Sequence, residues 1–370
     1  MTMTVNPSAS TPHSSEALRA ALAQAETSGD LAAQNTLLGE LGRALLRQDD
    51  SLPALACFEK GLKVAQQLDD KPSGARHLAN QGLALAQIGN FGLAMRAYRK
   101  ALGFAADLAD APMQYDLLFH MAELERARQS PENALGHLDE ALAIAERHRS
   151  LNRIQRVRAA MGQISLDQEE FEEAREHFEA ALSLAREIGD VGEQSICLNA
   201  LGGLARSRRD ASAAAGFFAQ ALALPAETQS SRLRLALLAQ LADLRFGQGD
   251  LEISRQMFSE ALALSRQLGD QASETRLLGS LGLIAADQGD PGQALALANE
   301  AVALARQLAD PVLQGEQLLY QAMALADHDR VEDALTACDA AIVDFEQVEA
   351  SSLLQKAWDL KERIGNPADE

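Results

Sequence analysis

The sequence predicts an all-α repeat protein, and three observations support this prediction. The segment FEAALSLAREIGD at 178–190 returns as FSEALALSRQLGD at 258–270, and stepping by half that distance, 40 residues, finds Ala-Leu pairs in register along the chain. Apolar residues within these segments recur at the i, i+3, i+4 and i+7 spacing of one helix face. Hydrophobic residues make up 47% of the chain but aromatic residues only 4%, which favours closely packed helices rich in Ala and Leu. Self-similarity at this period indicates a repeat architecture.

The repeat predicts one solenoid rather than several domains, because each repeat needs its neighbour to bury its apolar face. We expect, in order, a disordered tail (1–13), an N-terminal capping helix (14–30), eight repeats of 40 residues (31–350), a C-terminal capping helix (351–364) and a short tail (365–370). The first tail consists largely of Thr, Ser, Pro and Asn, which bury little apolar surface. The closing helix carries Leu353, Leu354, Ala357, Trp358 and Leu360, which would cover the last repeat.

Turn residues predict where the helices begin and end. Gly289 is expected to end a first helix in the left-handed conformation, and Asp290 to cap the second helix that follows. The same pairing recurs at 89–90 and 249–250. Asp190 with Glu193 forms the pattern of a capping box.

Pro225 interrupts this pattern inside the last turns of a second helix. Continuing a helix through proline costs roughly 3 kcal/mol, so we expect this helix to end near Leu224. The polar segment 226–231 then leads into the next repeat. This stretch is the predicted irregularity of the solenoid and a candidate hinge.

Composition argues against several classes of function. The net charge is −20 and no run of clustered Lys and Arg is present, which disfavours nucleic acid and anionic membranes as partners. Cys57, Cys197 and Cys338 are too far apart to suggest a disulfide framework or a metal site. The first 15 residues lack a secretory signal pattern, and no stretch is apolar enough to span a bilayer, so we expect a cytoplasmic protein.

No pattern of catalytic residues is apparent. His120 with Glu123, and Glu173 with His177, share helix faces, but two groups fall short of the ligand set of a zinc site. No glycine-rich phosphate loop and no nucleophile motif occur. We therefore expect a non-enzymatic protein without cofactor or metal.

The repeated columns resemble the tetratricopeptide repeat (TPR) in a 40-residue form. One repeat shows the pattern as Leu201-Gly202, Ala214, Phe218 and Ala221, and another opens with Leu41-Gly42, Ala54 and Phe58. Some repeats depart from this pattern. Ala298, Leu138 and Cys338 replace the aromatic residue, and Ala122 and Ala322 replace the glycine. The resemblance implies a right-handed superhelical solenoid of antiparallel helix hairpins. The lengthened form is similar to that of Pins-type adaptors, kinesin light chains and bacterial regulators.

The resemblance also implies that the first helix of each hairpin lines a concave groove that holds a protein or peptide. Asn80 occupies a position that often grips peptide backbone in the adaptors, but Ala160, Ala200 and Ser280 replace it in other repeats. The lysine-rich clamp of chaperone-binding members is also missing. The groove candidates are Arg76, Asn80, Phe119, Arg126, Arg156, Arg206, Asp243, Phe246, Asp287 and Tyr320. For the three aromatic candidates, ordinary packing between repeats is an equal alternative.

Charged groove positions are unevenly distributed about Pro225. Arginines predominate before it, whereas Arg276 is the only comparable cation after it, against Asp243, Asp287, Glu316 and Asp327. A solvated helix face with random charge is one interpretation; the other is a groove whose first half suits acidic segments and whose second half suits basic ones. The sequence thus predicts a scaffold or adaptor that binds a polypeptide in its groove. The alternative is a regulatory sensor whose superhelix changes shape when a peptide or small ligand binds.

Overall fold

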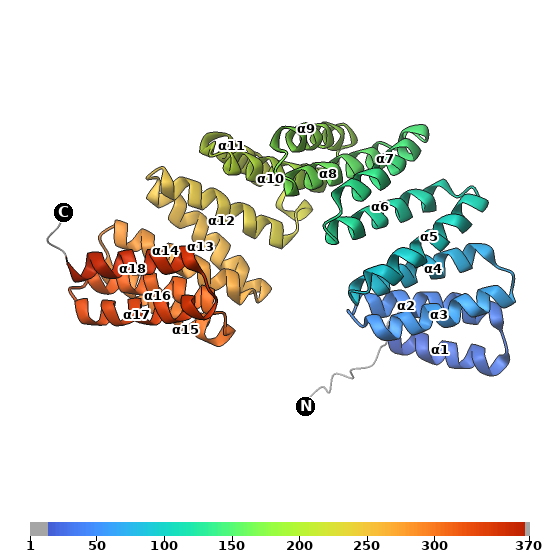
Figure 1. The fold of residues 1–370 in the computed structure, drawn as a ribbon, viewed down its shortest axis with the longest axis horizontal. Coiled ribbons are helices and arrows are strands. Elements are labelled where there is room, and N and C mark those ends of the chain that lie inside the picture. The colour runs from blue at the N-terminus through green and yellow to red at the C-terminus, as the bar shows by residue number, and fades with distance from the viewer. Residues whose placement is uncertain (1–13, 367–370) are drawn as a thin grey trace, which may run out of the picture. The chain divides into compact units, whose positions relative to one another are not determined.

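The computed structural model describes residues 14–366, and in this range the chain forms α-helices, one short 3-10 helix and no strand (Figure 1). The all-α fold class is confirmed. The predicted tail at 1–13 and the last four residues of the predicted tail at 365–370 lie outside the described residues. The chain forms two compact units that divide between Leu184 and Ala185, within α9.

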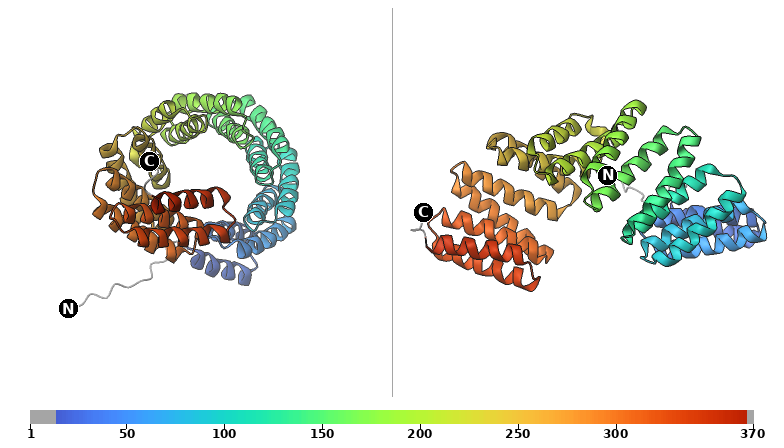
Figure 2. Two further views of the ribbon diagram at one scale, coloured as in Figure 1. Left: turned by 60° about the vertical axis from the view of Figure 1, so that its left-hand side comes forward. Right: turned by 45° about the horizontal axis from the view of Figure 1, so that its top comes forward.

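Consecutive helices of each unit form antiparallel hairpins that stack in series (Figure 2). The first unit contains α1 (Ser15–Ser28), α2 (Leu31–Leu46), α3 (Ser51–Gln67), α4 (Lys71–Gln87), α5 (Phe91–Asp107), α6 (Ala111–Ala127), α7 (Pro131–Arg147), α8 (Leu151–Asp167) and most of α9 (Phe171–Ile188). The second contains the end of α9, α10 (Val191–Ser207), α11 (Ala211–Leu222), η1 (Ala226–Thr228), α12 (Ser231–Gly247), α13 (Leu251–Leu268), α14 (Gln271–Asp287), α15 (Pro291–Leu308), α16 (Pro311–Ala326), α17 (Val331–Gln347) and α18 (Ser351–Gly365). Even-numbered helices from α2 to α16 are the first helices of the hairpins.

The predicted turn chemistry is present. Gly289 has a φ of 77°, in the left-handed region that suits glycine, and the Asp290 carboxylate accepts a hydrogen bond from the Gln293 amide at 2.9 Å. Asp190 likewise accepts from the Glu193 amide at 3.1 Å. Asp250 departs from this pattern, since it precedes α13 without a side-chain capping bond.

A glycine and an aromatic ring hold several hairpins together. Phe58, Tyr98 and Phe218 are at most 1% exposed. Each lies against a first-helix glycine, Gly42, Gly82 or Gly202, where a Cβ atom would come within 2.4 Å of the ring. The ring therefore occupies space that only glycine leaves open, which explains why the two columns occur together in the sequence.

The connection at Pro225 is irregular, as predicted. Helix α11 ends at Leu222, before the predicted Leu224, and η1 leads to Gln229. The buried Gln229 side chain donates from Nε2 to the carbonyl oxygens of Ala221 at 2.7 Å and Leu224 at 3.2 Å. The Ala221 carbonyl oxygen also accepts from the Leu224 amide at 3.2 Å, so Gln229 adds to the hydrogen bonding at the end of α11. The two compact units divide some 40 residues earlier in the chain, and a hinge at Pro225 stays a prediction.

Helix α18 covers the apolar face of the last hairpin. Ala357 and Leu360 are buried in a cluster with residues of α16 and α17, including Phe345. Trp358 is 47% exposed, and the Lys361 ammonium lies 5.2 Å from the centre of its ring. Burial of the final hairpin against a helix with a polar outer face is what a solenoid end requires. Among the described helices, none combines the length and apolar character needed to cross a bilayer.

Candidate binding site in the C-terminal unit

All ten groove candidates lie on first helices, five in each unit. The first unit holds Arg76, Asn80, Phe119, Arg126 and Arg156, and the second holds Arg206, Asp243, Phe246, Asp287 and Tyr320. The two sets differ in what their side chains contact.

Several candidates of the first unit contact other residues of the chain. The Phe119 ring is 8% exposed, and the Arg156 guanidinium lies 4.7 Å from its centre, which favours the packing alternative for Phe119. Arg126 Nη1 forms an ion pair with Asp167 Oδ2 at 2.9 Å. Arg76 is exposed and donates to Ser73 Oγ at 3.0 Å, and Asn80 is half-buried. Because Arg126 already has a carboxylate beside it, its attraction for an acidic ligand is reduced.

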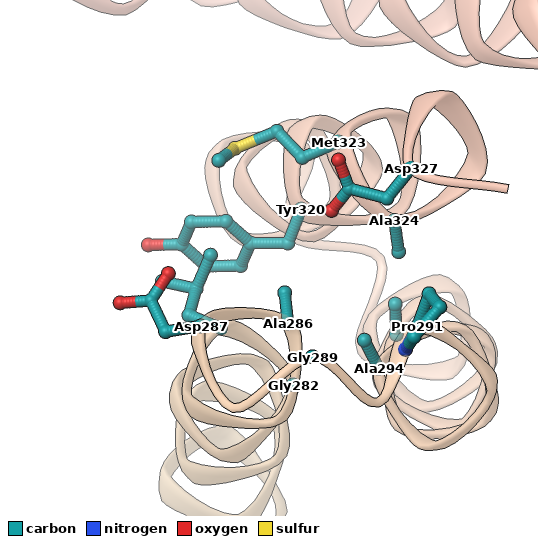
Figure 3. A pocket seen from close by; sticks show the side chains of 12 residues that line it. Gly282, Ala286, Asp287, Gly289, Pro291, Ala294, Tyr320, Met323, Ala324 and Asp327 are labelled. Atoms are coloured by element: carbon teal, nitrogen blue, oxygen red, sulfur yellow. The ribbon is translucent and has the colours of Figure 1, made fainter. Parts of the chain in front are cut away.

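The second unit brings two candidates together at a pocket. Asp287 and Tyr320 line a cavity of about 460 Å³ bounded by α14, α15 and α16, which we call the α14–α16 pocket (Figure 3). Ala286, Pro291 and Ala294 line its floor, and Met323, Ala324 and Asp327 come from α16. Figure 3 shows Asp287 beside the hydroxyl end of Tyr320, with Pro291 and Ala294 towards the other end. The volume falls within the range of about 300–1,000 Å³ typical of ligand pockets.

The pocket lies where Ala298 replaces the aromatic residue of its column, and where a second column, aromatic only at Phe246, also holds alanine. Ala298 occupies the column of Phe218, and Ala286 occupies the column of Phe246, which packs against the core one repeat earlier. Helix α15 closes part of the space, since a Cβ atom on Gly282 would lie 3.4 Å from the Ala294 carbonyl oxygen. The remaining space forms the pocket. The sequence signal was the substitution at Ala298.

Glycine in α14 sets the position of the Tyr320 ring. A Cβ atom on Gly279 would lie 2.8 Å from Tyr320 Cδ2. A residue larger than glycine at position 279 would therefore push the Tyr320 ring out of its place. Burial raises the pKa of Tyr320, and the carboxylates of Glu316 and Asp243 raise it further. The Tyr320 hydroxyl is therefore neutral at physiological pH and available as a hydrogen-bond donor.

Two carboxylates give the pocket a negative rim. Asp287 is the last residue of α14 and Asp327 is the C-cap of α16, and helix C-termini carry negative partial charge. Within residues 14–366, neither carboxylate has a cationic side chain within 4.0 Å. Asp167 occupies the same column as Asp287 three repeats earlier, and it pairs with Arg126 of the preceding repeat. In the repeat that precedes Asp287, the position of Arg126 is taken by Phe246, which carries no charge. The charge of Asp287 is thus left for solvent or a ligand.

Asp243, on α12, contributes negative charge to the region around Tyr320. Its side chain is exposed, but the surrounding helices displace enough water to raise the pKa of its carboxyl, while Arg206 acts in the opposite direction. A carboxylate that is accessible yet poorly hydrated is typical of a concave surface. Asp243 adds to the negative potential around Tyr320.

A second pocket lies on the other side of α16. This α16–α18 pocket has a volume of about 560 Å³ and an apolar floor that includes Leu353 and Leu360. Tyr320 and Met323 line both pockets. Sequence reasoning missed Met323, which is 39% exposed and lies on the first helix α16.

The thiol and metal candidates give no sign of a reactive centre. Within residues 14–366, no three His, Cys, Asp or Glu side chains come together as metal ligands. His120 Nδ1 lies 3.1 Å from Glu123 Oε2, one turn away on the same helix. Burial raises the pKa of the Cys57 thiol and raises that of Cys338 to about 11, which disfavours the reactive thiolate.

Comparisons with known proteins agree with the repeat assignment. The fold resembles that of a Signal Transduction ATPase with Numerous Domains from Pyrococcus horikoshii with a tetratricopeptide repeat sensor (TM-score 0.68, 13% identity, 97% of this chain and 56% of that chain). It also resembles aspartyl phosphate phosphatase F from Bacillus subtilis (0.60, 14%, 94% and 96%) and the apo quorum sensor NprR from B. thuringiensis (0.59, 13%, 90% and 97%). At these identities the likeness shows the fold alone. No curated protein sequence matches the chain significantly.

Sequence models of the family give the assignment directly. Two models described as tetratricopeptide repeat match residues 40–109, 153–227 and 233–307, which together make up more than half of the chain. These ranges include the Gly–aromatic hairpins of both units and helices α14 and α15 of the α14–α16 pocket. The chain therefore belongs to the tetratricopeptide repeat family.

Proposed function

We propose that this protein is a non-catalytic adaptor that binds a segment of another polypeptide on the first-helix face of its C-terminal unit. The supporting observation is the pair of pockets on either side of α16, which share Tyr320 and Met323. Peptide-binding grooves hold their ligands by anchoring a few side chains in such pockets. The net charge of −20 favours a protein partner over nucleic acid or an anionic membrane, and we expect the protein in the cytoplasm.

Site-specific photocrosslinking tests this proposal in the full chain. A photoreactive amino acid would replace Met323, between the two pockets, or Ala296, which is exposed on the second helix α15. After irradiation in extract of the native host, we expect adducts with a polypeptide from position 323 and few from position 296. Adducts that form equally well at both positions, or only at 296, would place the partner on the outer surface instead.

A regulatory sensor is the second candidate function. The irregular connection between α11 and α12 supports it, because a proline and a 3-10 turn replace the regular turn found at other hairpins. Small-angle scattering of the full chain, with and without the crosslinked polypeptide's binding segment, separates the two functions. A change in radius of gyration on binding indicates a sensor, whereas a constant radius indicates a passive adaptor.

A further inference from the structure

We propose that the α14–α16 pocket takes an aromatic side chain of the bound polypeptide, with a neighbouring Lys or Arg held by Asp287 and Asp327. This inference rests on the proposed function and deepens it by naming the chemistry of the bound segment. It also identifies which of the two pockets provides the anchor.

The shape of the pocket argues for a ring. Phe218 and Phe246 fill the equivalent columns in earlier repeats of the same unit, whereas Ala298 and Ala286 leave space at the pocket. Alanine, proline and methionine side chains line much of the pocket, and Tyr320 offers an aromatic face that a second ring can stack on or approach by its edge. An incoming aromatic side chain would restore packing that the chain itself provides elsewhere.

The charge around the pocket argues for a cation next to that ring. Asp287 and Asp327 are exposed, lie at helix C-termini and have no cationic partner within 4.0 Å in the described part of the chain. Glu316 and Asp243 add negative potential near Tyr320. A guanidinium or ammonium group is the side-chain chemistry that complements two carboxylates, and it is also attracted to an aromatic face.

The α16–α18 pocket lacks this combination. Its rim carries Lys356 and Arg363 together with Asp359 and Glu316, so cations and carboxylates are balanced. A basic segment gains less there, because Lys356 and Arg363 repel its positive charge. The preference for a cation beside the ring therefore belongs to the α14–α16 pocket.

Synthetic peptides test the inference without knowledge of the natural partner. The probe is a fluorescently labelled peptide with one central Phe between two Arg residues in a Gly-Ser background. Two companions replace either Phe with Ala or both Arg with Glu. Binding to the full chain would be measured by fluorescence anisotropy at low and physiological salt. We expect the Phe-Arg peptide to bind at least 10-fold more tightly than either companion, with affinity that falls as salt rises.

Variants of the protein locate the binding. Ala286→Phe fills the pocket with the residue that the preceding repeat carries in this column, and it should weaken binding of the Phe-Arg peptide at least 10-fold. The matched control is Ala86→Phe, the same change in the same column of the first unit, which should leave affinity unchanged. The double variant Asp287→Asn, Asp327→Asn changes only exposed side chains, so it tests the cation site even if Ala286→Phe disturbs folding. It should remove most of the salt dependence.

The possible outcomes separate this inference from the proposed function. Equal binding of the Ala or Glu companions, or unchanged binding by both pocket variants, would overturn the aromatic-plus-cation assignment. If photocrosslinking at Met323 still captures a polypeptide in that case, the adaptor function stands and only the chemistry assigned to its ligand is wrong. If crosslinking at Met323 also fails, both proposals fall. Crosslinking of a second copy of this chain at Met323 would identify the pocket as a self-association site and would also overturn the inference.

Discussion

Two regions have the same repeat pattern: the hairpin α4–α5 with α6, and the hairpin α14–α15 with α16. They differ in whether an aromatic side chain fills the space between the helices. In the first, Tyr98 is buried against Gly82 and stacks on His120 with ring centres 6.1 Å apart. Five repeats later, Ala298 and Tyr320 stand in the positions of Tyr98 and His120, and a pocket remains. One repeat uses its aromatic residue for stability, and the other leaves room that a ligand can fill.

The rims of these two sites differ as well. Gln87 and Ala127 of the first site correspond to Asp287 and Asp327 of the second. Gln87 Oε1 accepts a hydrogen bond from Ser51 at 2.7 Å, whereas the two carboxylates have no cationic partner in the described residues. Small changes at fixed columns thus convert a structural hairpin into a candidate binding site without altering the helices.

The largest expected effect comes from removing the ring that the first site contains. Tyr98→Ala should lower the free energy of unfolding by about 3–5 kcal/mol, the range for truncating a buried aromatic side chain. Denaturant unfolding followed by circular dichroism measures the loss, and hydrogen exchange at α4 and α5 locates it. A loss below about 1 kcal/mol would mean that the hairpin collapses onto the space, and the contrast between the two sites would disappear.

A methyl group added to the paired glycines sharpens the comparison. Gly82→Ala would place Cβ 2.4 Å from the Tyr98 ring, so we expect destabilisation of about 1–3 kcal/mol. Gly282→Ala meets its nearest atom at 3.4 Å and gains helix propensity, so it should change stability by less than about 1 kcal/mol. Denaturant midpoints of the two variants give the difference, and equal losses would contradict the structure of the second hairpin.

Acid should destabilise the first unit through His77. The imidazole is buried, its Nε2 lies 2.8 Å from Asn35 Oδ1, and no partner for Nδ1 is found among the described residues. Burial is the largest cause of its lowered pKa, and Arg76 and Arg43 lower it further. The unfolded chain therefore binds a proton more readily, so stability is lost as pH falls below about 6.5, the ordinary histidine value.

The second unit offers a built-in reference for this pH effect. Gln317 occupies the His77 column six repeats later, and its amide does not titrate. Hydrogen exchange at pH 7.5 and 5.5 should show greater loss of protection in α2–α4 than in α14–α16. His77→Gln should remove the difference, and persistence of the difference in that variant would assign it to other groups.

The smallest effects concern the carboxylates of one column. Asp167→Asn removes the exposed ion pair with Arg126 and should cost about 0.2–1 kcal/mol. Asp287→Asn removes a carboxylate that faces no cation at the end of α14, so it should be neutral or slightly stabilising. Thermal unfolding at low salt measures both changes. A clear loss on Asp287→Asn would show that this carboxylate has a structural partner.

Much of the fold could be predicted because local signals repeat. Period, capping residues and Pro225 each act within a few positions in the sequence, so the turn at Gly289 and Asp290 falls where the pattern placed it. The burial of Phe119 could not be decided from its column, because it depends on Arg156 of the next first helix. The pocket could not be predicted from the sequence either. Ala298 signals a missing ring, but only the structure shows that α15 closes just part of the gap.

The turns themselves have a consequence for engineering. Every residue of the described chain with a left-handed φ has a number ending in 9, and ten of them are not glycine. A side chain in the left-handed conformation is strained, and this strain costs more than the extra entropy that glycine gives the unfolded chain. Glycine at each of these positions should therefore raise the free energy of unfolding by about 0.5–1 kcal/mol. Because the stability of a repeat array is nearly a sum of local contributions, glycines placed at one end would raise the melting temperature of that end alone. The order in which the two ends melt is thus adjustable without touching either helix face.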